Sequence, residues 1–153
     1  MKTTLYLLRD LGEAEQRQRQ AEAIRDFLAL RGFDCCLCGP EPVLGWIASR
    51  VARPHNISLQ EVAELAAPGG EETPAQFQAR IAAAFEAIWE GHAGECVLVV
   101  AHVTSHRQYL SDVLHAVEEA VRLSPGGISI VLRDSGATWV QTLNCLFHLQ
   151  GLA

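Results

Sequence analysis

The sequence lacks the features that would place the chain in a membrane or on a nucleic acid. No stretch approaches the about 18 consecutive apolar residues that a membrane-spanning helix needs. The apolar run Leu5–Leu8 is shorter than the core of a secretory signal, and Arg9 and Asp10 follow it directly. Acidic residues outnumber basic ones and give a net charge of −6, which excludes a general affinity for nucleic acid or anionic lipid. We therefore expect a cytoplasmic protein with neither a nucleic acid nor a membrane as its partner.

The five cysteines do not follow the pattern of a disulfide framework or of a zinc site. Their odd number and the missing export signal favour reduced thiols. Three of them lie in the run Cys35–Cys38, but no second Cys-x-x-Cys pair follows. In an extended strand Cys36 and Cys38 share one side and Cys35 takes the other, so the three sulfurs cannot converge on one ion. We interpret this run as a buried strand and expect neither a bound metal nor a cofactor.

The chain also lacks internal repeats, low-complexity tracts and linkers, and its 153 residues, 49% of them apolar, predict one domain over residues 1–153. Short apolar segments alternate with amphipathic ones. We expect strands at Thr3–Leu8, Phe33–Cys38, Cys96–Ala101, Ile128–Leu132 and Thr138–Leu143. We expect helices at Ala14–Leu30, Val43–Val51, Pro74–Trp89 and Ser105–Val121, and a short helix or turn within His55–Leu65. This alternation predicts an α/β three-layer sandwich with a mainly parallel central sheet and a C-terminal β-hairpin.

Polar residues follow the predicted strands at the edge where open parallel sheets bind their ligands. Arg9 and Asp10 come after the first strand, and His102 comes after Cys96–Ala101, just before a predicted helix. A helix N-terminus offers free N–H groups and a positive dipole end to an anion. We expect Arg9, His102 and this helix end to converge on one oxyanion such as phosphate. The other interpretation of Arg9 is a solvated charge at a strand end, and Arg107, about one turn beyond His102, fits either picture.

Segments spread over nearly the whole chain follow the order of a known superfamily. Thr4–Arg9 is similar to a strand that ends in Arg-His-Gly, and Arg19–Ala23 is similar to a Gly-x-x-Gln-Ala helix. Val97–His102 is similar to a Val-Leu-Val-Val-Ser-His strand, and Arg107 stands where a His-Gly-Gly-x-x-Arg pattern has its arginine. These patterns belong to the histidine phosphatase (phosphoglycerate mutase-like) superfamily. The chain length and Glu64–Gly70 resemble its short phosphohistidine-phosphatase-like branch, and the resemblance implies a phosphate-transfer site.

The sequence departs from that superfamily at the residues that matter most for catalysis. Asp10 stands at the position of the nucleophilic histidine, and Leu11 replaces the glycine after it. Val43 stands where the second phosphate-binding arginine belongs. Of the four residues that the resemblance implies for holding a phosphoryl group, only Arg9 and His102 remain. The negative charge of Asp10 repels a phosphate, and the lost arginine removes a bidentate grip.

Three functions remain open at this stage. The first is a pseudo-enzyme that binds a phosphorylated small molecule, another anion or a protein. The second is a residual phosphomonoesterase or phosphohistidine phosphatase that uses His102 with Arg9 and Arg107. The third is a purely structural role as an oligomerising or partner-docking subunit. An open pocket shared by Arg9 and His102 favours the first two, whereas a pocket filled by Asp10, Leu11 or Val43 favours the third. The identity of the ligand, the oligomeric state and the pathway stay open.

Overall fold

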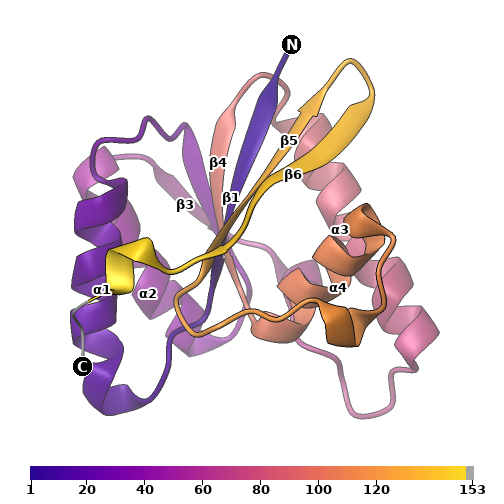
Figure 1. Cartoon of the computed structure of the whole chain (residues 1–153), viewed down its shortest axis with the longest axis horizontal. Helices are drawn as coiled ribbons and strands as arrows, with labels where there is room; N and C mark the ends of the chain where they lie inside the picture. The colour runs from indigo at the N-terminus through magenta and orange to yellow at the C-terminus, as the bar shows by residue number, and fades with distance from the viewer. Residues whose placement is uncertain (151–153) are drawn as a thin grey trace.

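A six-stranded mixed sheet forms the centre of the computed structural model, which describes residues 1–150 (Figure 1). The strands are β1 (Thr3–Arg9), β2 (Cys35–Cys38), β3 (Ser58–Glu61), β4 (Cys96–Ala101), β5 (Ile128–Asp134) and β6 (Ala137–Cys145). Their order across the sheet is β3-β2-β4-β1-β5-β6. The first four in this order run parallel, and β5 is antiparallel to both β1 and β6. The predicted mainly parallel sheet with a C-terminal hairpin is confirmed.

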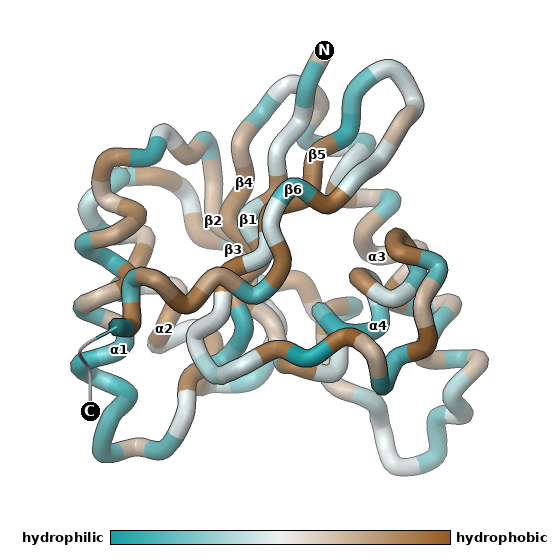
Figure 2. The backbone as a smooth tube through the Cα atoms, in the orientation of Figure 1, coloured by the Kyte–Doolittle hydropathy of each residue, from teal (hydrophilic) through white to brown (hydrophobic). Residues whose placement is uncertain are grey.

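Helices cover both faces of the sheet and complete the three layers (Figure 1). On one side lie α1 (Ala14–Leu28) and α2 (Pro42–Ala52), and on the other lie α3 (Pro74–Gly91) and α4 (Val103–Leu114). The helix α3 begins with a capping box, in which Gln76 N–H donates to Thr73 Oγ1 over 3.1 Å. Figure 2 shows hydrophilic residues along α1 and hydrophobic ones along β4. Among residues 1–150, no helix is both long and apolar enough to cross a bilayer.

Two apolar cores lie on the opposite faces of the sheet, because successive side chains of a strand point to opposite sides. In β4, Val97 and Val99 pack beneath α3 and α4, while Leu98 and Val100 pack beneath α1 and α2. All four side chains are fully buried, as the unbroken apolar run predicts. The cysteines of β2 divide in the same way, with Cys35 in the first core and Cys36 and Cys38 in the second.

One strand is missing from the sequence expectations. Residues 58–61 form the edge strand β3, parallel to β2, where we expected a short helix or turn. Every residue of β3 is exposed. The alternation of apolar and polar residues that identifies a half-buried strand is therefore absent, and the expectation was wrong for this physical reason.

Two helix ends were also placed wrongly. The helix α1 ends at Leu28, and Leu30, which was expected on its buried face, is 95% exposed. The helix α4 ends at Leu114 instead of Val121, because His115 adopts a left-handed conformation with φ of 52°. A separate 3-10 turn at Glu118–Ala120 follows. Apolar residues continue at helical spacing beyond Leu114, so the sequence pattern did not indicate that the helix ends there.

Candidate functional site

Three parallel strands end side by side and bring the polar residues that follow them to one edge of the sheet. Arg9 of β1 is in register with Ala101 of β4, and Cys38 of β2 is in register with Val100. The pairing continues past the strands, because Asp10 N–H donates to the carbonyl of Ala101 over 3.2 Å. This edge lies away from the N-terminus in Figure 1 and adjoins the start of α4. We call Arg9, Asp10, His102 and the Val103 N–H the strand-end site.

Asp10 occupies the N-terminus of α4 with its own carboxylate. Its Oδ1 accepts a hydrogen bond of 3.0 Å from Val103 N–H, the first residue of the helix. The same oxygen lies 3.3 Å from Arg9 Nε, and the two side chains are only 19% and 20% exposed. A helix N-terminus beside a guanidinium group is a favourable place for an anion. Here the chain supplies that anion itself.

The guanidinium group of Arg9 is held from both sides. Besides the ion pair with Asp10, its Nη1 donates to the main-chain carbonyl of Leu123. The main chain of this region is fixed as well, since Arg9 N–H donates to the Gly127 carbonyl over 3.1 Å and Gly126 N–H donates to the Asp10 carbonyl over 3.2 Å. Arg9 is therefore a partly buried strand-end residue whose guanidinium group is paired within the chain, rather than a solvated charge.

His102 is the N-cap of α4, and this role sets the protonation of its ring. Its Nδ1 accepts a hydrogen bond of 3.2 Å from Thr104 N–H and lies 2.7 Å from Thr104 Oγ1. A nitrogen that accepts an N–H bond carries no proton, so the neutral ring has its proton on Nε2. In this form Nε2 is able to donate to an oxyanion. It offers no lone pair for nucleophilic attack on phosphorus.

His106 lies one turn further along α4 and is buried beneath the strand-end site, with 1% of its surface exposed. Its Nε2 donates to the carbonyl of Leu8 over 3.0 Å. Burial lowers the pKa of His106 to about 4, although the Leu8 carbonyl and the Asp10 carboxylate act in the opposite direction. The sequence led us to expect a surface or partly buried helix residue at His106, and its complete burial corrects this expectation. The signal lay in its helical spacing of i, i+4 from His102, which repeats the inward face of α4.

Arg107 and Val43 lie outside this cluster of contacts. Arg107 Nε is 3.4 Å from Glu118 Oε1, and both side chains are 37% exposed. Val43 lies in the first turn of α2 and lines a cavity of about 420 Å³ together with Ala14, Arg17 and Trp46. Sequence reasoning missed Arg17, a guanidinium group of α1 at this cavity. Predicting it requires the packing of α1 on α2, which the local sequence does not reveal.

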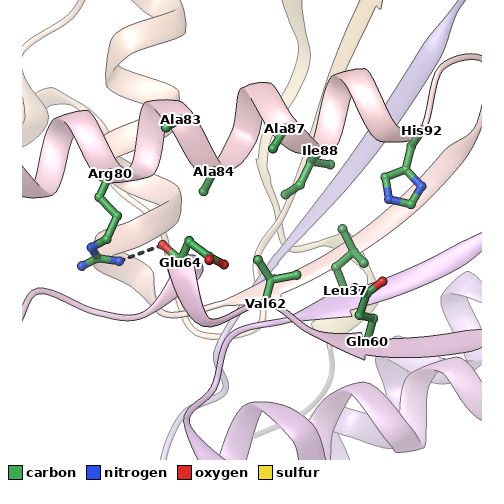
Figure 3. A pocket seen from close by; sticks show the side chains of 10 residues that line it. All are labelled: Leu37, Gln60, Val62, Glu64, Arg80, Ala83, Ala84, Ala87, Ile88 and His92. Carbon is green, nitrogen blue, oxygen red and sulfur yellow. Dashed lines mark hydrogen bonds between the residues drawn. The ribbon is translucent and has the colours of Figure 1, made fainter.

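The loop before α3 forms one wall near the site and is fastened at several points. Arg80 of α3 donates to the carbonyl of Glu64 over 2.7 Å (Figure 3). It also donates to the carboxylate of Glu72 over 2.7 and 2.8 Å and to the carbonyl of Ala66 over 2.9 Å. From the other side, Ser105 Oγ of α4 donates to the Leu65 carbonyl over 2.8 Å. These hydrogen bonds therefore fix the position of the loop relative to α4.

Comparisons with known proteins agree with this architecture. The sequence matches the model of the histidine phosphatase superfamily (branch 1) over residues 44–146, a range that contains His102 and begins after Val43. No curated protein matches the chain. A solved structure of Bacillus stearothermophilus YhfR is 16% identical, with a TM-score of 0.88 over 97% of this chain and 100% of that one.

Two further solved structures share the fold. Phosphoserine phosphatase from Entamoeba histolytica in complex with 3-phosphoglyceric acid is 14% identical, with a TM-score of 0.82 over 96% of this chain and 99% of that one. Phosphoglycerate mutase from Bacillus anthracis is 14% identical, with a TM-score of 0.81 over 97% of this chain and 95% of that one. Because the family model covers well over half of the sequence, the chain belongs to the histidine phosphatase superfamily.

Proposed function

We propose that this chain is a pseudo-enzyme of the histidine phosphatase superfamily, which binds a ligand or partner and does not turn over phosphate esters. One observation carries the proposal. The residue that the resemblance assigns to the position of the nucleophilic histidine is Asp10, and its carboxylate contacts Val103 N–H and Arg9, the groups that would otherwise hold a phosphoryl oxygen.

The chemistry of phosphoryl transfer explains why this arrangement opposes turnover. The resemblance implies a covalent phosphohistidine, for which an unprotonated ring nitrogen must lie in line with the leaving group. Asp10 offers a carboxylate instead, and two unit charges of the same sign 4 Å apart repel by about 4 kcal/mol near a protein surface. His102 does not replace the nucleophile, because its Nδ1 caps α4 and its Nε2 carries the proton.

The groups that remain still favour binding of an anion once Asp10 moves aside. Arg9, the Nε2 proton of His102 and the N-terminus of α4 are three donors at one sheet edge. Arg107 would join them only by leaving Glu118. We propose a phosphorylated small molecule or another anion as the ligand of the displaced state. If no anion displaces Asp10, the filled site favours docking of a protein partner, which does not need to enter the site.

The first prediction concerns anion binding by Asp10→Asn, which removes the charge and keeps the shape of the side chain. We expect this variant to bind inorganic phosphate at least about tenfold more tightly than the unaltered chain, which corresponds to about 1.4 kcal/mol. Isothermal titration calorimetry measures the difference. The matched control is Asp26→Asn, which removes an equal charge from an exposed site on α1 and is expected to change nothing. Equal phosphate affinity of Asp10→Asn and the unaltered chain would contradict anion binding at this site.

A turnover assay on the purified unaltered chain tests catalysis directly. We expect no turnover of small phosphomonoesters or of a phosphohistidine protein by the unaltered chain. Loss of a catalytic nucleophile costs up to about a millionfold in kcat. Turnover that His102→Ala abolishes would overturn the pseudo-enzyme proposal and establish the residual phosphatase that uses His102 with Arg9. Absence of both turnover and phosphate binding in every variant would leave the protein-partner role alone.

A further inference from the structure

A second cluster of chemically active side chains lies at the opposite end of the sheet from the strand-end site. Cys35 is the first residue of β2, His92 is the C-cap of α3, and Glu95 directly precedes β4. The amino ends of β2 and β4 are adjacent, since Cys35 is in register with Val97. One ligand atom from each of Cys35, His92 and Glu95 lies within 4.8 Å of the other two.

The distances within this cluster match the spacing of ligands around a small tetrahedral ion. Cys35 Sγ is 3.5 Å from His92 Nδ1, and His92 Nδ1 is 3.4 Å from Glu95 Oε1. With ordinary zinc–ligand bond lengths and tetrahedral angles, sulfur and nitrogen ligands stand about 3.6 Å apart, and nitrogen and oxygen ligands about 3.3 Å apart. Two of the three distances therefore match those around a tetrahedral ion, and the third pair, Cys35 and Glu95, has its ligand atoms within 4.8 Å of each other.

The main chain around the cluster holds its three members in place. Glu95 N–H donates to the His92 carbonyl over 3.0 Å and closes the turn that carries both residues. Next to Cys35, Asp34 N–H donates to the Cys96 carbonyl over 2.8 Å, and Cys96 N–H donates back to Asp34 Oδ2 over 2.8 Å. The two segments that supply the ligands are thus joined to each other by hydrogen bonds, which makes the arrangement ready for an ion.

A groove adjoins the cluster at His92. His92 forms one end of a cavity of about 410 Å³ between α3 and the strands β2 and β3, beside Leu37 and Gln60 (Figure 3). Cys35 itself is 7% exposed and lies in the core beneath α3. Catalytic zinc sites combine three protein ligands with a water molecule at the fourth position. Here the side chains of His92 and Glu95 are 22% and 39% exposed, so solvent is able to reach that position.

We propose that Cys35, His92 and Glu95 form a site for one divalent transition-metal ion of the zinc class, with its fourth position open to solvent. A thiolate and a carboxylate carry two negative charges, which balance those of the ion, and a neutral imidazole completes the set. The sequence expectation of no metal considered only ligands within residues 35–38, which diverge across the strand. The site instead takes one cysteine from β2 and two ligands from the turn before β4. It is independent of the pseudo-enzyme proposal, because no residue is shared.

The test uses the purified full chain after removal of metal with a chelator. We expect Co²⁺ to bind with one ion per chain and to produce a thiolate-to-cobalt charge-transfer band, which Zn²⁺ then removes by displacement. Cys35→Ser abolishes the band, and His92→Gln and Glu95→Gln each weaken binding by at least about tenfold. The matched control is Cys96→Ser, next to Glu95 in sequence but packed against the other core, and it retains the band.

Thermal melting separates loss of the site from loss of the fold. Zn²⁺ is expected to raise the Tm of the unaltered chain and of Cys96→Ser, and to leave the Tm of Cys35→Ser unchanged. The melt of each variant without metal shows that it is folded. Three results would overturn the proposal: no stoichiometric binding to the unaltered chain, a band that survives Cys35→Ser, or a cobalt spectrum without thiolate charge transfer. In those cases the three side chains form only a hydrogen-bonded chain.

Discussion

His106 makes stability depend on pH at the scale of a single side chain. The pKa of this residue is about 4 in the folded protein and about 6.5 in an unfolded chain. Because the folded pKa is the lower one, the unfolded chain takes up the proton first as the pH falls. The stability that neutral His106 contributes is complete above pH 6.5 and is lost progressively down to about pH 4, by about 3 kcal/mol in total.

The prediction is a difference between two pH profiles. From pH 7 to pH 5 the unaltered chain is expected to lose about 2 kcal/mol more free energy of unfolding than His106→Gln, which keeps a donor for the Leu8 carbonyl and cannot be protonated. Urea unfolding at both pH values measures it. Every other titrating group is common to the two proteins and cancels in the comparison. Parallel profiles would show that His106 is not buried in a neutral form.

The residues of the strand-end site show what the sequence was able to predict. Arg9, Asp10 and His102 follow apolar runs, so their arrival at one sheet edge was predictable from strand ends alone. The hydrogen bond from Val103 to Asp10 and the proton on Nε2 of His102 were not, because both depend on side-chain rotamers and on the first turn of α4. The partner of Arg107, Glu118, escaped prediction for a related reason, since the helix was expected to continue through it.

At the scale of secondary structure, the loop between β3 and α3 depends on one arginine. The planar guanidinium group of Arg80 bonds both carboxylate oxygens of Glu72 and several carbonyls at once, a pattern that a lysine ammonium cannot reproduce. We predict that Arg80→Lys increases amide hydrogen exchange in residues 64–72 by about tenfold or more while the exchange of β4 is unchanged. The matched control is Arg25→Lys, an exposed arginine paired with its neighbour Asp26. Uniform exchange rates in both variants would mean that Ser105 alone fixes the loop.

Elements with a buried face were predictable, and elements without one were not. The strand β4 is an unbroken apolar run, β1 contains the run Leu5–Leu8, and α3 carries apolar residues at helical spacing; the positions of all three were confirmed. The strand β3 joins the sheet through main-chain pairing with β2, and its side chains contribute no apolar signal. The end of α4 depends on the left-handed conformation of His115, which a histidine adopts less readily than a glycine.

At the scale of the whole molecule, the two cores share the strand β1. Leu7 packs beneath α3 and α4, and Leu8 packs beneath α1 and α2. We predict that Leu7→Ala and Leu8→Ala each cost about 3 kcal/mol and that each lowers the stability of both layers together. Fluorescence reports on Trp89 in one layer, on Trp46 in the other and on Trp139 of β6, and far-ultraviolet circular dichroism follows the secondary structure of the whole chain. Separate transitions by the two probes would show that residues 1–153 do not unfold as one domain.

Asp10 belongs to the same chain as the groups that its carboxylate contacts, and this affects how an anion in solution would compete for them. A carboxylate tethered to its own binding partners has an effective concentration of millimolar or more, whatever the amount of protein present. An incoming anion therefore binds with its intrinsic affinity multiplied by the fraction of molecules in which the carboxylate has left Val103. Free inorganic phosphate competes poorly under this rule. If the proposed function holds, a phosphorylated ligand that makes additional contacts outside the strand-end site would supply the extra free energy that displacement needs, and the internal carboxylate would select for larger ligands.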